Sequence, residues 1–219
     1  MRISKLKEFT DITILLDRSG SMFSIKEAME TAIDSFIKEH RVNPTTKVSL
    51  VQFDGDNDQE IVYQSVPVSA VEKFTLVPRG NTPLLDALCK VIDRTGERLA
   101  SMKESDRPDQ VLMVIITDGQ ENASQRYSRH DVKNRITRQR NDYKWQFVYL
   151  GANQDAFTEA ASFGIPSNWA LTYDASQKGV LGATRALNVN TVSYTTSVDR
   201  SAPVRDFDED QRKQAKDTL

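Results

Sequence analysis

Three oxygen-bearing side chains follow a short apolar run near the start of the chain. The run covers residues 12–16, and Asp17, Ser19 and Ser21 come directly after it, each separated from the next by one residue. A carboxylate and two hydroxyls on one turn form an all-oxygen set, which suits a hard divalent cation such as Mg²⁺. Open α/β sheets bind ligands beyond the carboxyl ends of their strands, so a strand over residues 12–16 would place this set at a binding edge.

Two further oxygen donors come from distant segments. Thr82 precedes Pro83 at the expected start of a helix, and Asp118 follows residues 111–116, the most apolar run of the sequence. Taken singly, each of the five residues could be an ordinary helix cap or turn residue. Together they predict a cation site, for Mg²⁺ first and for Mn²⁺ or Ca²⁺ as alternatives, because oxygens from three segments can meet at one sheet edge.

The spacing of apolar residues supplies the elements that would position this site. Strands are expected at residues 12–16, 47–53, 61–66, 111–116, 145–150 and 170–173. Helices are expected at residues 25–37, 83–99 with Thr82 as the N-cap, 128–144, 155–163 and 178–187. This alternation predicts an α/β fold of the Rossmann-like kind. Its sheet would be doubly wound, six-stranded and mostly parallel, with helices on both faces and the strand at 61–66 as an antiparallel edge.

Size and composition are those of one soluble globular domain. The chain has 219 residues, of which 38 % are hydrophobic and 27 % charged. We expect residues 1–195 to form the domain, and residues 196–219, which are charged and poor in apolar side chains, to form a flexible tail. The net charge of -2 gives no general attraction to nucleic acid or to an anionic membrane.

The apolar runs and the cysteine content of the sequence bear on the localisation of the protein. No apolar run approaches the roughly 20 residues of a membrane span, and residues 12–16 are too short for the core of a secretory signal. The single cysteine, Cys89, rules out an internal disulfide framework and is expected on the buried face of a helix. These features predict a cytoplasmic protein, of a bacterium or of a phage-infected host.

The motif segments resemble those of the von Willebrand factor A (vWA) domain family. Residues 17–22 match its Asp-x-Ser-x-Ser motif, residues 80–84 its threonine loop and residues 117–119 its third segment, within a similarity over about residues 10–190. The resemblance implies a complete metal-ion-dependent adhesion site in a stand-alone protein of bacterial or phage type. In such a site the serines and the threonine bind Mg²⁺ directly, or switch in doing so, and the aspartates act mostly through waters. A Glu or Asp of a protein partner takes the sixth position.

The favoured function is therefore a metal-dependent protein–protein interaction module without enzymatic activity. The resemblance suggests an AAA+ ATPase or an assembly component as partner classes. One alternative is a structural subunit of a larger cellular or phage assembly, in which the metal only stiffens the loops. A metal-dependent phosphohydrolase is a further alternative, but an aspartyl nucleophile at Asp17 would call for a second acid where Ser19 stands.

A second acidic pattern is read differently. Asp54, Asp56 and Asp58 are spaced like the start of an EF-hand loop. The pattern then fails, because Gln59 stands where a glycine is needed and Ser65 where a bidentate glutamate is needed. We interpret this segment as a solvated hairpin turn.

Basic residues gather in the segment after Asp118. Residues 126–144 carry seven basic residues, Arg126, Arg129, Lys133, Arg135, Arg138, Arg140 and Lys144. A solvated helix face is the simpler interpretation. Because the segment follows the Asp118 loop, a sharper hypothesis is that Arg126 and Arg129 steer an acidic partner toward the metal.

Overall fold

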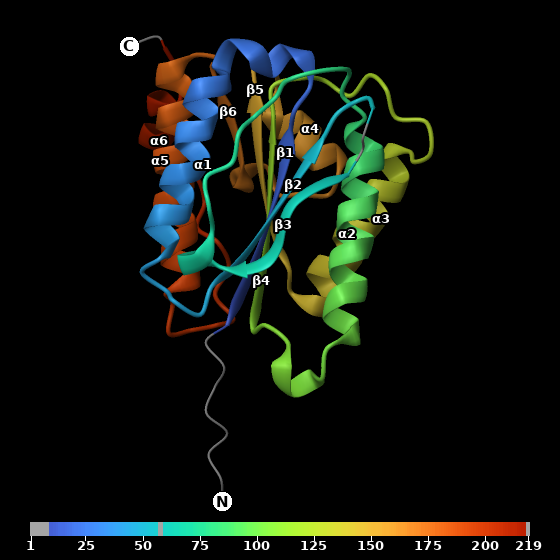
Figure 1. Cartoon of the computed structure of the whole chain (residues 1–219), viewed down its shortest axis with the longest axis vertical. Coiled ribbons are helices and arrows are strands. Elements are labelled where there is room, and N and C mark those ends of the chain that lie inside the picture. The colour runs from blue at the N-terminus through green and yellow to red at the C-terminus, as the bar shows by residue number, and fades with distance from the viewer. Residues whose placement is uncertain (1–8, 57–58, 218–219) are drawn as a thin grey trace, which may run out of the picture.

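Six strands form one sheet at the centre of the molecule (Figure 1), in a computed structural model that describes residues 9–56 and 59–217. The strands are β1 (Thr10–Asp17), β2 (Lys47–Phe53), β3 (Glu60–Pro67), β4 (Gln110–Thr117), β5 (Gln146–Ala152) and β6 (Ala170–Tyr173). They lie in the order β3-β2-β1-β4-β5-β6, and every pair is parallel except β2 with β3. The predicted α/β sheet with one antiparallel edge strand is confirmed.

Helices cover both faces of the sheet (Figure 1). One layer contains α1 (Lys26–His40), α5 (Gln177–Thr195) and α6 (Glu209–Gln214), and the other contains α2 (Leu84–Ser101), α3 (Arg129–Tyr143) and α4 (Ala156–Ser162). None of the helices in the described ranges has the length and apolar character needed to cross a bilayer.

The two cores follow from the alternation of side chains along each strand. In β1, Ile12, Ile14 and Leu16 pack toward α1 and α5, whereas Leu15 packs toward α2. All eight residues of β4 are buried, which is why its sequence is a continuous apolar run and does not alternate. Parallel β1 and β4 lie side by side, so their carboxyl ends open at the same edge of the sheet.

The start of α2 differs from the prediction. The helix begins at Leu84, so Pro83 and not Thr82 holds the capping position. Two backbone N–H groups of the first turn are satisfied from the loop after β4 instead, where Glu121 accepts from Leu85 (2.9 Å) and Ser124 accepts from Asp86 (3.1 Å). Thr82 therefore does not serve as the helix cap, and its hydroxyl is available for another role.

The C-terminal segment also differs from the prediction, because it packs against the domain. Val204, Phe207 and Ala215 are buried in the core beneath α1 and α5, and α6 carries a complete capping box at Asp208. Lys216 forms an ion pair with Asp174 after β6 (3.0 Å). The expectation of a flexible tail is thus wrong for the described residues up to 217, since a few irregularly spaced apolar side chains are enough to anchor it.

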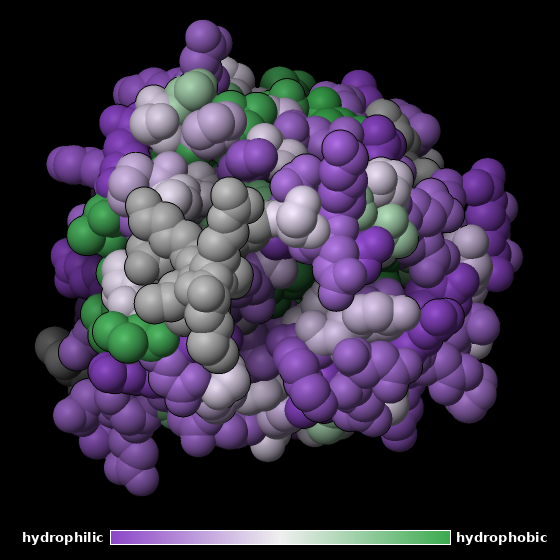
Figure 2. All heavy atoms as spheres, turned by 90° about the horizontal axis from the view of Figure 1, so that it is seen from below, coloured by the Kyte–Doolittle hydropathy of each residue, from purple (hydrophilic) through white to green (hydrophobic). Residues whose placement is uncertain are grey.

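The two ends of the sheet are formed by different segments of the chain. The end at which β1 begins faces the viewer in Figure 2, and apart from the atoms drawn in grey it is mostly hydrophilic. The opposite end, at the top of Figure 1, holds the loops that follow β1 and β4 and the segment that leads into α2. The residues singled out by the sequence lie at this second end.

Candidate metal centre

The first three predicted ligands are fixed by short hydrogen bonds at the end of β1. Asp17 is the last residue of the strand, and its Oδ1 accepts from the backbone N–H of Ser19 (2.7 Å). The hydroxyls of Ser19 and Ser21 lie 3.0 Å apart. A 3₁₀ helix over Gly20–Ile25 carries Ser21, and it is held in place by the buried side chains of Met22 and Ile25.

The segment after β4 interlocks with this loop. Ser21 donates its hydroxyl hydrogen to Oδ1 of Asp118 (2.6 Å). Thr117, the last residue of β4, donates to Oδ2 of Asp17 (2.6 Å) and accepts from the backbone N–H of Gly119 (3.2 Å). The first and third motif segments therefore share direct contacts, although about a hundred residues separate them in the sequence.

The surroundings of Gly119 show that the hydroxyl of Thr82 lies close to Asp17 and Ser21. A methyl group on Gly119 would stand 2.8 Å from Oγ1 of Thr82 and 3.6 Å from both Oδ2 of Asp17 and Oγ of Ser21. Thr82 is held there by Asn122, whose Oδ1 accepts from its N–H (3.0 Å) and whose N–H donates to its carbonyl (3.2 Å). The structure thus brings together all five predicted residues, Asp17, Ser19, Ser21, Thr82 and Asp118.

The two carboxylates of this site, of Asp17 (buried) and Asp118 (half-buried), have neutral hydrogen-bond partners. Asp17 is 0 % exposed, and burial raises its pKa to about 6, although the hydrogen bonds from Thr117 and Ser19 lower it. Burial also raises the pKa of Asp118, against the hydrogen bond from Ser21. Such carboxylates favour an added cation, and hydroxyl oxygens are acceptable ligands for a hard one. The donor set therefore fits Mg²⁺.

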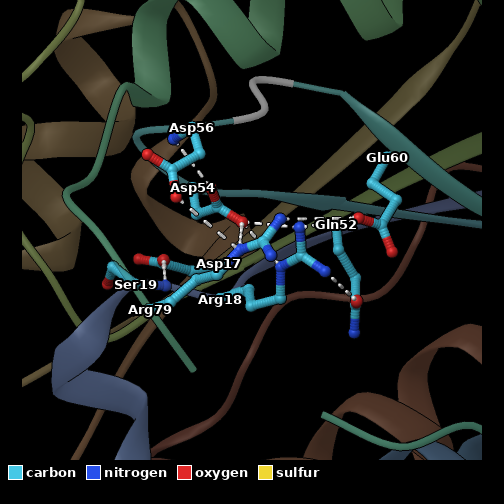
Figure 3. Close-up of polar contacts among 8 residues, drawn as sticks. All are labelled: Asp17, Arg18, Ser19, Gln52, Asp54, Asp56, Glu60 and Arg79. Carbon is cyan, nitrogen blue, oxygen red and sulfur yellow. Dashed lines mark hydrogen bonds and ion pairs between the residues drawn. The ribbon is translucent and has the colours of Figure 1, made fainter. Parts of the chain in front are cut away.

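The charged residue inside the motif does not neutralise these carboxylates. Arg18 is buried, and its guanidinium is turned toward Asp54, Glu60 and Gln52 (Figure 3). Burial alone would lower the pKa of Arg18, but its hydrogen bonds to Glu60 and Asp54 raise it on balance. Arg18 is thus committed to the neighbouring hairpin and not to Asp17.

The interpretation of the Asp54 segment as a solvated hairpin turn is wrong for Asp54 itself. Asp54 is 0 % exposed and accepts from Arg18 and Arg79, so it is an internal ion-pair partner and not a solvated turn residue. Asp56 is exposed as expected, and Asp58 lies outside the described residues. In the part of the chain that the structure describes, no group of three or more His, Cys, Asp or Glu residues could hold a metal ion, so the predicted site depends on its hydroxyls.

A match to a family model shows to which protein family this chain belongs. The model of the von Willebrand factor type A domain matches residues 11–170. This chain belongs to that family. Among curated proteins, none matches the chain. Domains of the vWA family are mostly non-enzymatic, and protein–protein interaction is the general role of the family.

Solved structures with a similar fold are distant in sequence. The pilus adhesin SpaC from Lactobacillus rhamnosus GG, in its open conformation, has a TM-score of 0.64 and 12 % identity over 86 % of this chain and 30 % of that one. Proximal thread matrix protein 1 from the mussel byssus has a TM-score of 0.60 and 16 % identity over 83 % of this chain and 47 % of that one. The vWF domain of the pilus tip protein Mfa5 from Porphyromonas gingivalis has a TM-score of 0.55 and 9 % identity over 83 % of this chain and 95 % of that one. The chain thus spans less than half of the mussel protein and of SpaC, and these likenesses show the fold alone.

The two arginines predicted to steer a partner differ in their surroundings in this vWA domain. Arg129 donates to Glu159 (2.7 Å) and to Ser162 (3.1 Å), so its charge is largely balanced within the protein. Arg126 is exposed, and only its backbone N–H has a contact among the described residues, with the carboxylate of Asp86. Their role in steering stays a prediction.

Several residues that shape the vWA site were missed from the sequence. Thr117 orients Asp17, Asn122 holds Thr82, and Gly119 leaves the space between them. Asp86 accepts from the backbone N–H groups of residues 125–127 and so fixes the course of the loop after β4. The adjacency of Thr117 and Gly119 to Asp118 was the only available signal, because the other contacts join residues about 40 positions apart.

Proposed function

We propose that this vWA domain binds a divalent cation, Mg²⁺ in the first place, through Asp17, Ser19, Ser21, Thr82 and Asp118. When bound, the ion would supply an electrophilic position for a carboxylate of an acidic residue on a protein partner. The observation that carries the proposal is the space beside Gly119, where oxygens of three separate segments face one point. Mn²⁺ and Ca²⁺ are alternatives to Mg²⁺.

The charges of the site support capture of an anionic group. Two carboxylates and three neutral hydroxyls leave a divalent ion without a surplus of negative ligands, so it would retain affinity for an outside acid. Asp17 and Thr82 are buried, whereas Ser21 is exposed, so the site has a side that faces solvent. A partner carboxylate would approach from that side.

Filling the space beside Gly119 tests the metal site directly. We expect isothermal calorimetry to show one Mg²⁺ per wild-type chain and Gly119→Ala to weaken binding at least tenfold, because the new methyl group would contact Oγ1 of Thr82. Gly96→Ala is the matched control, since a methyl group there would meet only the side chain of Gln139, at 3.5 Å. A wild-type protein that takes up no divalent ion would sink the proposal.

Capture of a partner is tested separately from metal binding. Immobilised wild-type protein should retain its partner in Mg²⁺ and release it in EDTA, while Ser21→Ala should retain little in either buffer. Identification of the retained proteins would distinguish an AAA+ ATPase from an assembly component. Retention that is equal in both buffers and in Ser21→Ala would contradict an acid-to-metal contact.

The second candidate is a structural subunit, in which the ion only stiffens the loops. It is favoured by the nature of the similar structures, which are those of pilus and byssal-thread proteins. Thr82→Ala separates the two roles, because Thr82 is not the helix cap and its loss should weaken partner capture more than stability. Equal loss of partner capture and of the free energy of unfolding would favour the structural role.

Hydrolysis is a weaker candidate for this site. The hydroxyl contacts of Ser19 and Ser21 among the described residues are with each other and with Asp118, so neither serine is activated by a histidine or lysine. We expect no phosphatase activity above background in Mg²⁺ or Mn²⁺. Turnover of a phosphomonoester that disappears in Asp17→Asn would overturn this expectation.

A further inference from the structure

A buried carboxylate joins the loop of Asp17 to the segment that carries Thr82. Oδ2 of Asp54 accepts from Nε of Arg18 (2.7 Å) and from Nε of Arg79 (3.1 Å), as Figure 3 shows. Arg18 stands between Asp17 and Ser19, and Arg79 directly precedes the threonine loop, residues 80–84. One internal acid thus contacts both segments that would supply ligands to the metal.

Backbone contacts follow the same path. The N–H of Arg79 donates to the carbonyl of Arg18 (2.8 Å), and the N–H of Gly20 donates to the carbonyl of Gly80 (3.1 Å). Gly80 has a φ of +67°, and a methyl group on it would stand 3.1 Å from the backbone nitrogen of Gly55. The start of the threonine loop is therefore packed between the Asp17 loop and the hairpin turn, and both the positive φ and the close backbone of Gly55 disfavour a side chain at Gly80.

We propose that Arg18, Asp54 and Arg79 form a latch that fixes the threonine loop, so that the metal site is assembled before the ion arrives. This inference rests on the proposed function. The latch residues are positioning residues, since none of their side chains belongs to the ligand set. Arg18 is nearly fully buried and Asp54 fully buried, which makes their contact strong and directional.

The latch has a consequence for affinity. A loop that is ordered only on binding subtracts its ordering free energy from the affinity, whereas a loop held in place beforehand does not. If the latch is released, Mg²⁺ must order the threonine loop itself. We therefore expect weaker metal binding and a loop whose exchange with solvent depends on the metal.

Arg79→Gln is the decisive variant, because Arg79 is half-exposed and its loss should leave the fold intact. We expect roughly tenfold weaker Mg²⁺ binding by calorimetry, in line with the loss of one charge-assisted hydrogen bond. In EDTA, the amides of Arg79 and Thr82 should exchange faster in the variant than in the wild type, and Mg²⁺ should restore slow exchange. In the wild type, Mg²⁺ should change exchange at these amides little.

Two controls keep the test specific. Arg94→Gln removes an exposed arginine whose hydrogen bonds are long, to Gln59 (3.4 Å) and Gln64 (3.5 Å) of the same hairpin, and should alter neither readout. In a Thr82→Ala background, Arg79→Gln should cause no further loss of Mg²⁺ affinity, because the loop then supplies no ligand. Arg79→Lys should give an intermediate affinity, and it replaces Arg79→Gln should that variant not fold.

The outcomes separate the latch from the proposed function. Wild-type Mg²⁺ binding together with unchanged affinity and exchange in Arg79→Gln would overturn the latch and leave the metal site standing. Absence of Mg²⁺ binding in the wild type would overturn the proposed function. Exchange of the two amides in EDTA would then still show whether Arg79 fixes the loop.

Discussion

Strand β1 carries a fully buried aspartate near each end, and the two have different partners. Asp11 receives two hydrogen bonds from the guanidinium of Arg98, at 2.7 and 3.0 Å. Asp17 receives its hydrogen bonds from a backbone N–H and from the hydroxyl of Thr117, both neutral groups. Among the described residues, Asp11 thus has an internal cation and Asp17 has none.

This difference distinguishes Asp11, which stabilises the fold, from Asp17, which we propose binds a cation. A buried carboxylate is strongly disfavoured unless it is paired, so evolution of a stable core calls for a partner such as Arg98. The one arginine beside Asp17 in the chain, Arg18, is instead directed to Asp54. The arrangement leaves the charge of Asp17 for a cation from outside, and each prediction below contrasts a paired charge with an unpaired one.

Removal of the paired acid should have the largest effect. Asp11→Ala leaves Arg98, whose side chain is 18 % exposed, without its counter-charge, and should lower the free energy of unfolding by about 3–5 kcal/mol. Urea unfolding measures this loss, and Mg²⁺ affinity of the folded protein should be unchanged. The double variant Asp11→Ala/Arg98→Met should lose less than Asp11→Ala. A double variant that loses as much as both single variants together would show that the pair is not coupled.

A buried histidine without an ion-pair partner among the described residues should make the stability of the protein depend on pH. His40 is 0 % exposed, its Nδ1 donates to the carbonyl of Phe36 (2.8 Å), and its Nε2 has no partner among the described residues. Burial lowers its pKa to about 4. Between pH 6.5 and pH 4 the imidazole of His40 therefore binds more protons in the unfolded chain than in the folded one, and this group should lower the free energy of unfolding by about 3 kcal/mol as the pH falls through this window. Asp17, whose pKa is raised to about 6, contributes in the opposite direction below pH 6, so the His40 contribution is read from the difference between variant and wild type.

The histidine prediction is checked by urea midpoints at pH 7, 5.5 and 4. Relative to the wild type, His40→Leu should become more stable by about 3 kcal/mol at pH 4 than at pH 7, whereas His130→Ala, at an exposed histidine, should follow the pH dependence of the wild type. Persistence of the full slope in His40→Leu would assign the pH dependence to other groups.

Removal of the unpaired acid should affect binding more than folding. Asp17→Asn keeps the size of the side chain and removes a buried charge, so the free energy of unfolding in EDTA should change by less than about 1 kcal/mol or rise. Mg²⁺ affinity should fall about 10- to 100-fold, as for loss of a residue that orients metal ligands. Calorimetry measures the affinity, with Asp109→Asn at an exposed position as control. A stability loss as large as that of Asp11→Ala would remove the distinction between the two acids.

The sequence was sufficient for the fold and for the five candidate ligands. The mostly parallel sheet and its antiparallel edge strand follow from the alternation of strands and helices, and Asp17 and Asp118 follow strands whose apolar runs are unambiguous. Contacts between distant polar residues were not predictable in the same way. Asp54 looked like a turn residue because its local composition is polar, and only the fold places Arg18 and Arg79 against it.

The tail shows the same limit of local patterns. Residues 197–217 contain few apolar side chains and no periodicity, yet Val204 and Phe207 are buried against α5 and the end of the sheet. Burial of these side chains depends on the shape of the surface against which the tail packs. Local sequence patterns do not predict that shape. Thr82 is a third case, because a residue suited to cap a helix lies one position too early to do so.

The smallest effect is expected for the exposed arginines Arg126 and Arg129, one of which has an ion-pair partner among the described residues and one of which does not. Arg129 is paired with Glu159, whereas the side chain of Arg126 has no ion-pair partner among the described residues. Arg126→Gln should therefore slow association with an acidic partner about two- to threefold and flatten its dependence on salt, and Arg129→Gln should do so less. Association rates at low and high ionic strength, measured with the protein retained in the Mg²⁺ experiment, check this order. A larger effect at Arg129 would mean that its ion pair with Glu159 opens when the partner arrives. Equal rates for both variants and the wild type would show that neither arginine takes part in steering.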